Sequence, residues 1–265
     1  MGEHKARLIV VLLLILSWSS LGSGTIGIVA YSSTTFWIVT DGRQTDPWGN
    51  PTGTVCKIRQ GAGFYWVAVT TFYRDERLGF SLPLIVDSIP YGEGTLPSRL
   101  DQLLPKLAVP LAAELRRLKT DFVGGPASTL QLRLMCARYV TGQQFPLEIA
   151  FVSLDKNKRP SLAWLDVQAR DISGIVYIEG VSKQGIPVTD RNPVDFFMIG
   201  PRDVAEPFLK GAVEHWTGQP SPAELMREAV RREEEVPGIN FVGGPISVLQ
   251  VDENGPLWIE LGACK

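Results

Sequence analysis

Apolar, β-branched and aromatic residues gather in short runs at both ends of the chain, and such runs are typical of strands. Four pairs of these runs are separated by short turn sequences. They are residues 25–31 with 36–40, 54–59 with 64–71, 145–154 with 160–166, and 246–251 with 256–261. Residues 195–199 add one more short apolar run. The pattern therefore predicts four hairpins and a single strand.

Longer segments between the hairpins have the residue types of helices. They are residues 72–89, 98–122, 202–216 and 221–235. In the last of them, Ser221 can cap the helix, Pro222 suits its first position and Glu224 completes a capping box. The order is strands, two helices, strands, two helices and strands, without a linker. This order predicts one α+β domain in which two antiparallel sheets lie between helix layers.

The first 24 residues have a different pattern and are interpreted as a signal peptide. Lys5 and Arg7 precede the unbroken apolar run Leu8–Leu16, and small residues follow up to Gly24. The run is too short to span a bilayer, so the expected contact with a membrane is only through this segment. We expect residues 25–265 to be exported to the periplasm or the extracellular space. Cleavage could follow Ser19, Gly22 or Gly24.

The net charge and the histidine count exclude several classes of function. The formal net charge of −2 lacks the basic surplus that nucleic-acid binding needs. Only two His are present, one of them in the signal segment, so catalysis by imidazole and multi-His metal sites are not expected.

The three Cys show no metal-ligand spacing and allow at most one internal bridge, and we interpret them as small buried residues. The sequence FVGGP occurs twice, and we interpret both copies as glycine turns before strands.

Three residues stand in a regular relation. Thr25 opens the first predicted strand, Asp41 follows the second, and Lys57 lies in the third. A hairpin returns the end of its second strand to the start of its first, so Asp41 is expected beside Thr25. Lys57, on a neighbouring strand, can reach the same point.

These residue types suit a nucleophilic site without histidine. A Thr hydroxyl is a weak nucleophile until a base takes its proton. If Thr25 is the first residue of the mature chain, its own α-amine can be that base, because its ordinary pKa is about 8. Lys57 would lower the pKa of this amine, and Asp41 would hold Lys57 and balance its charge.

The residues TIGIVAYSSTTFWIVTDGRQT, followed by CKI, resemble the start of proteasome β-type subunits, which are N-terminal nucleophile hydrolases. Thr25, Asp41, Arg43, Thr45 and Lys57 match that family's pattern. The resemblance implies a four-layer αββα sandwich, a Thr25 nucleophile supported by Asp41 and Lys57, and hydrolysis of peptide or amide bonds. It also implies supporting roles for Arg43, Thr45 and Thr71, with the oxyanion-hole position at Thr70 or Thr71. It further implies a homo-oligomeric ring, with no metal and no cofactor.

The chain departs from the family at three places. Pro201, Ile239 and Val242 stand where the family has Ser, Asp and Ser. Two alternatives therefore stand beside the threonine peptidase: a catalytically inactive binding or assembly protein, and an amidase or acylase acting on small molecules.

Overall fold

The computed structural model describes most of residues 25–264. The described ranges are 25–45, 51–70, 74–75, 80–88, 145–172, 175–184, 194–214, 216–236 and 242–264, with single positions at 103, 106, 107, 109 and 113. The predicted signal segment 1–24 and most of the predicted helix 98–122 lie outside these ranges.

The first sheet has five antiparallel strands in the order β12-β1-β2-β13-β14. They are β1 (Gly27–Tyr31), β2 (Phe36–Thr40), β12 (Asp195–Ile199), β13 (Ser247–Asp252) and β14 (Gly255–Glu260). All five residues of β1 are buried, because both faces of this interior strand are covered. β14 lies at an edge and is mostly exposed.

The second sheet also has five antiparallel strands, in the order β11-β10-β9-β6-β5. They are β5 (Ile58–Gly61), β6 (Phe64–Thr70), β9 (Phe145–Leu154), β10 (Pro160–Ile172) and β11 (Ile175–Gln184). Two small hairpins form separate two-stranded sheets: β3 (Arg43–Thr45) with β4 (Pro51–Thr54), and β7 (Arg74–Asp75) with β8 (Phe80–Ser81).

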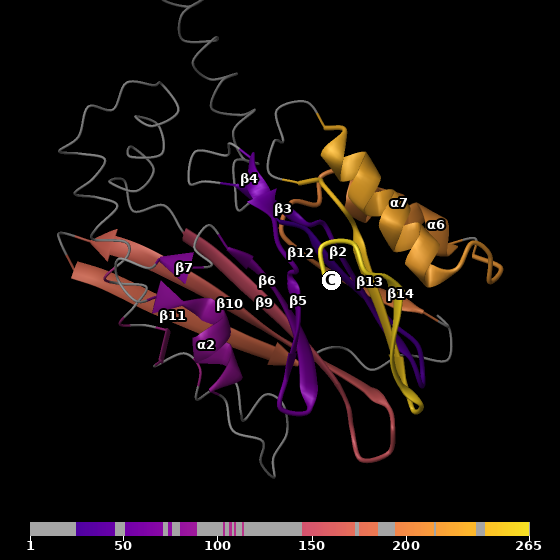
Figure 1. Ribbon diagram of the computed structural model, residues 1–265, viewed down its shortest axis with the longest axis horizontal. Coiled ribbons are helices and arrows are strands. Elements are labelled where there is room, and N and C mark those ends of the chain that lie inside the picture. The colour runs from indigo at the N-terminus through magenta and orange to yellow at the C-terminus, as the bar shows by residue number, and fades with distance from the viewer. Residues whose placement is uncertain are drawn as a thin grey trace, which may run out of the picture.

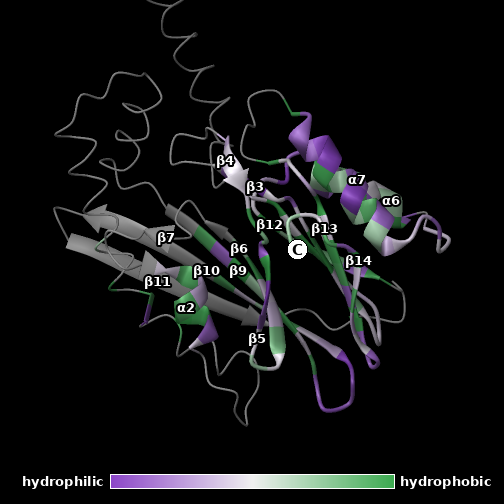
Figure 2. Ribbon diagram, in the orientation of Figure 1, coloured by the Kyte–Doolittle hydropathy of each residue, from purple (hydrophilic) through white to green (hydrophobic). Residues whose placement is uncertain are grey.

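Two helices cover the first sheet. α6 (Ala205–Glu214) and α7 (Pro222–Glu234) lie side by side over it (Figure 1). Figure 2 shows hydrophobic and hydrophilic residues alternating around both helices, as expected where one face packs on a sheet. The predicted capping box of α7 is confirmed: the Ser221 hydroxyl accepts from Glu224 N, and Ser221 N donates to the Glu224 carboxylate.

Alternating side chains divide the interior into three apolar clusters. One lies between the two sheets, where Val29 and Ile38 of the first meet Val67 and Ala150 of the second. Another lies between the first sheet and α6 and α7. The third covers the outer face of the second sheet, where Leu82 of α2 (Leu82–Asp87) packs with other apolar residues.

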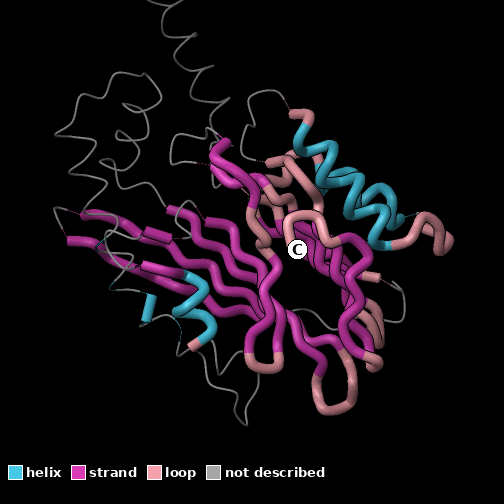
Figure 3. The backbone as a smooth tube through the Cα atoms, in the orientation of Figure 1, coloured by secondary structure: helices cyan, strands magenta, loops and turns pink. Residues whose placement is uncertain are grey.

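The prediction of a four-layer αββα sandwich is wrong. Antiparallel strands dominate the described ranges, in which three helices have described bounds, and two of these, α6 and α7, lie on the first sheet (Figure 3). The second sheet carries the six-residue α2. Residues 72–89, predicted as helical, contain the strands β7 and β8 before α2. Pro83 fits only near the start of a helix, and Ser88 already ends it. Within the described ranges, no helix is long and apolar enough to cross a bilayer.

Candidate active site

Asp41 is the centre of a buried polar cluster where β2 ends. Its carboxylate is fully buried and accepts three backbone N–H groups. Ile26 N lies 3.1 Å from Oδ1, while Gly243 N and Arg43 N lie 3.2 and 3.3 Å from Oδ2. Buried carboxylates need such partners, because water is absent. The cluster joins the start of β1, the end of β2 and the loop before β13.

Lys57 completes the cluster from the second sheet. Its Nζ lies 3.0 Å from Asp41 Oδ1 and 2.9 Å from Oδ2, and the residue is 5% exposed. Lys57 directly precedes β5, whereas Asp41 follows β2, so the ion pair links the two sheets. Burial lowers the pKa of Lys57 and raises the pKa of Asp41, while the attraction within the pair opposes both changes.

Thr25 lies two residues before β1 and is 5% exposed. In the β1–β2 register, Gly27 is opposite Thr40, which brings the residues before Gly27 toward Asp41. The bond from Ile26 N to Asp41 fixes the next peptide group in this position. The structure therefore brings Asp41 and Lys57 together beside the start of β1. The catalytic roles of these residues stay a prediction.

Arg43 holds the loop that caps Asp41. Its Nη1 donates to Val242 O at 2.7 Å, and its Nη2 donates to Glu234 Oε1 at 3.0 Å. Its backbone N also donates to Gly243 O at 2.8 Å. Arg43 thus connects α7 and the 242–243 peptides to the end of β2, which is a positioning task.

Gly243 is required where it stands. Its φ is +137°, and a Cβ there would collide with Glu234 Oε1 and with the Arg43 guanidinium. The absence of a side chain lets the backbone reach Asp41 Oδ2. The second FVGGP copy is thus the predicted turn before a strand, and it also supports the buried carboxylate. The first copy, Phe122–Pro126, lies outside the described residues.

The other predicted residues are placed only in part. Thr45 pairs through its backbone with Pro51 in the β3–β4 hairpin, and its side chain is not described. Thr71 and Ile239 lie outside the described residues. Val242, which stands where the family has Ser, is fully buried in the cluster beneath α6 and α7. Pro201 follows Gly200, just beyond the end of β12.

Sequence reasoning missed Glu148, Glu234 and Gly243. Glu148 Oε2 accepts from Gly200 N at 2.8 Å, which ties β9 to the end of β12 near the start of β1. Its signal was a single charge inside the apolar run FPLEIAFVSL. Gly243 had a signal in its glycine pair, whereas Glu234 looked like part of a solvated charge run.

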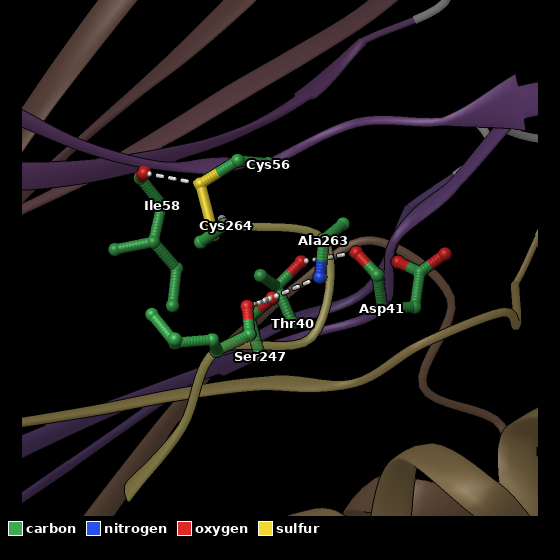
Figure 4. Close-up of a disulfide and its surroundings, with 8 residues drawn as sticks. Thr40, Asp41, Cys56, Ile58, Ser247, Ala263 and Cys264 are labelled. Carbon is green, nitrogen blue, oxygen red and sulfur yellow. Dashed lines mark hydrogen bonds between the residues drawn. A yellow bond between two sulfur atoms is a disulfide. The ribbon is translucent and has the colours of Figure 1, made fainter. Parts of the chain in front are cut away.

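Two of the three cysteines form an internal bridge, which is the largest number of bridges that the sequence allows. Cys56 and Cys264 form a disulfide across 208 positions of sequence (Figure 4). Cys136 lies outside the described residues. The bridge could not be read from spacing, because three cysteines allow several pairings. It lies one residue before Lys57, so it belongs to the surroundings of the candidate site.

Comparisons with known proteins add a fold likeness only. No family model matches the sequence, and no curated protein matches it. A solved structure of a Gly-1 mutant of Anbu from Hyphomicrobium sp. strain MC1 is similar to the chain at 16% identity, with a TM-score of 0.45. The match covers 89% of this chain and 88% of that one. A likeness of this degree carries no argument about the activity of this chain.

Proposed function

We propose that the chain is an exported threonine hydrolase that cleaves peptide or amide bonds with Thr25 as its N-terminal nucleophile. One observation carries the proposal: the buried Asp41–Lys57 ion pair, anchored to the backbone N–H of the residue after Thr25. An ion pair with this degree of burial is unfavourable to build for stability alone. The position of the ion pair beside the start of β1 supports a role in the chemistry of Thr25.

The reaction needs no group beyond this chain and water. The Thr25 hydroxyl oxygen attacks the substrate carbonyl carbon while the Thr25 α-amine takes the hydroxyl proton. The C–N bond then breaks, the α-ammonium returns the proton to the leaving amine, and an ester to Thr25 remains. Water attacks this ester with the amine again as base, which releases the acid and restores the hydroxyl.

Lys57 and Asp41 act on this chemistry through charge. The Lys57 ammonium favours the neutral form of a nearby α-amine and stabilises negative charge that develops on the carbonyl oxygen. Asp41 holds Lys57 at 2.9 Å in a site with little water, so the charge does not have to reorganise during the reaction.

Export and assembly are parts of the same proposal. Removal of residues 1–24 as a signal peptide would make Thr25 the first residue. The Cys56–Cys264 disulfide supports export, because such bridges persist in oxidising compartments. Four exposed apolar side chains on and after β14 support a homo-oligomer, since such residues favour contact with another subunit. They are Leu257, Trp258, Ile259 and Leu261.

A second candidate is a catalytically inactive binding or assembly protein with the same buried pair. The observation that favours it is the environment of Val242, which is fully buried in the apolar cluster below α7 and offers no hydroxyl to the site. Pro201 similarly offers neither a hydroxyl nor an N–H.

Two measurements on the exported protein test the proposal. N-terminal sequencing should find Thr25 first, and any other first residue excludes it as an N-terminal nucleophile. Hydrolysis of a fluorogenic peptide library should then fall by about 10³-fold or more in Thr25→Ala. Thr54→Ala, which changes an exposed threonine of β4, is the matched control and should hydrolyse at the wild-type rate. Equal rates for Thr25→Ala and wild type would favour the inactive binding protein.

A further inference from the structure

The four residues after β14, Leu261–Cys264, turn back toward the candidate site and are called the C-terminal hook here. Cys264 N donates to Leu261 O at 2.7 Å and closes the turn. Gly262 has a φ of +52°, and a Cβ there would collide with Ile246 O. The hook therefore has a defined shape and lies tightly against the start of β13.

Ser247 fixes the hook from the sheet. Its hydroxyl donates to Leu261 O at 2.9 Å and accepts from Ala263 N at 3.2 Å, so both sides of the turn are held by one side chain. Ser247 is 1% exposed, and in the sheet it pairs with Thr40, the residue before Asp41 (Figure 4).

The hook touches the chain next to both members of the ion pair. Cys264 is bonded to Cys56, and the next residue is Lys57. On the other side, a Cβ placed at Gly42 would lie only 2.9 Å from the Cβ of Ala263, so the hook packs directly against the residue after Asp41. The two contacts set the distance between the backbone segments that carry Asp41 and Lys57.

Lys57 needs such an anchor. It precedes β5, which lies at the edge of its sheet and pairs there with β6. Between β4 and β5, Val55 N donates to Gly42 O at 2.9 Å. Without the disulfide, the Lys57 segment would lose its covalent tie to the first sheet, and water could reach the buried ammonium group.

We propose that the C-terminal hook, through Ser247 and the Cys56–Cys264 disulfide, is a positioning element that holds Lys57 against Asp41. Its effect on catalysis rests on the proposed function, whereas its effect on Lys57 burial does not. The hook touches no reacting atom and acts only through the placement of Lys57.

Trace acetylation of amines with acetic anhydride, read by mass spectrometry of peptides, measures the burial of Lys57 directly. Lys156, exposed in the turn between β9 and β10, serves as the internal reference. We expect the Lys57-to-Lys156 labelling ratio to rise at least tenfold in Cys56→Ala/Cys264→Ala and several-fold in Ser247→Ala. Cys136→Ala removes a cysteine outside this bridge and should leave the ratio unchanged.

Kinetics on the same variants give the second readout. Loss of the hook should lower kcat at least tenfold and change KM less than twofold, because Lys57 acts on the developing charge and not on substrate binding. If the double cysteine variant does not fold, Ser247→Ala keeps the bridge and still tests the hook.

The outcomes separate the two proposals. An unchanged labelling ratio in a folded double variant would overturn the positioning role and leave the disulfide as a general stabiliser. A raised ratio in a protein whose wild type hydrolyses no peptide would support the positioning role and overturn the threonine hydrolase.

Discussion

Two ion pairs in this protein have nearly the same length and opposite surroundings. Lys57 Nζ lies 2.9 Å from Asp41 Oδ2, and the two side chains are 6% and 0% exposed. Lys210 Nζ lies 2.7 Å from Glu206 Oε1 on α6, and these side chains are 72% and 37% exposed. Distance therefore does not distinguish the pairs, and the difference between them is the access of water.

The pKa values of the two carboxylates shift in opposite directions, because water reaches one carboxylate and not the other. Burial raises the pKa of Asp41 despite the neighbouring ammonium group. On α6, the hydrogen bond from Lys210 lowers the pKa of Glu206, because burial is slight. When a partner is removed from the exposed pair, water replaces it. In the buried pair no water replaces a lost partner, so the charge of Asp41 and the charge of Lys57 each need the other residue.

Removal of Lys57 should have the largest effect on stability. Lys57→Met leaves Asp41 buried without its countercharge, and we expect the free energy of unfolding to fall by about 3–5 kcal/mol. Urea unfolding followed by circular dichroism measures the change. Asp41→Asn/Lys57→Met removes both charges and should recover most of the loss. A single variant within about 1 kcal/mol of wild type would show that water reaches Asp41.

Loss of the glycine beneath Asp41 should have a smaller effect. Gly243→Ala forces a side chain into a backbone conformation reserved for glycine and against Arg43, and we expect a loss of about 1–3 kcal/mol. Gly211→Ala on α6 is the matched control, because a Cβ there meets nothing within 4 Å. This control should gain about 0.5–1 kcal/mol in thermal unfolding, since alanine favours helices. If Gly243→Ala lost less stability than Gly211→Ala gains, residue 243 would not require glycine.

Removal of Lys210 should hardly change stability. Lys210→Ala breaks an exposed i,i+4 pair, and the expected loss is about 0.5 kcal/mol or less. Unfolding curves at 0.05 and 1 M NaCl should show this small loss disappearing at high salt, because salt screens exposed charges. The loss for Lys57→Met should persist in the same salt, and a salt-dependent loss there would remove the contrast between the pairs.

The contributions of Glu206 and Asp41 to folding stability should change in opposite directions as pH falls. The pKa of Glu206 is lowered by folding, so its small contribution to stability is present above pH 4.5 and is lost as pH falls through the lower native value. The pKa of Asp41 is raised, so the native state binds its proton first and gains stability relative to the unfolded chain as pH falls toward 3.8. Carboxyl carbon shifts in an NMR titration would show both directions, and equal directions would contradict this contrast.

Local patterns in the sequence predicted the parts of the fold that depend on neighbouring residues. Strand β2 has the predicted bounds, and α7 begins with the predicted cap at Ser221. Strand β11 (Ile175–Gln184) was missed, because its alternation is interrupted by Gly180 and by charged residues. The helix content of residues 72–89 was overestimated, since apolar residues near Pro83 fit both strands and helices.

In the candidate site, too, local relations could be predicted from the sequence and long-range ones could not. Asp41 could be placed beside the first strand, because one hairpin fixes that relation. Gly243 and Cys264 could not, since they lie 202 and 208 positions beyond their partners Asp41 and Cys56. Only the assembled fold brings them next to their partners, and no local sequence pattern predicts these contacts.

These distances along the chain have a consequence for biosynthesis. At roughly 5–20 residues per second, about 10–40 s separate the synthesis of Asp41 from that of Gly243, which donates to its carboxylate. Throughout that interval, Asp41 and Lys57 have no completed pocket. A chain interrupted before residue 264 would also lack the cysteine that holds the segment next to Lys57. The surroundings of Asp41 and Lys57 are therefore completed only after the last strands have been synthesised.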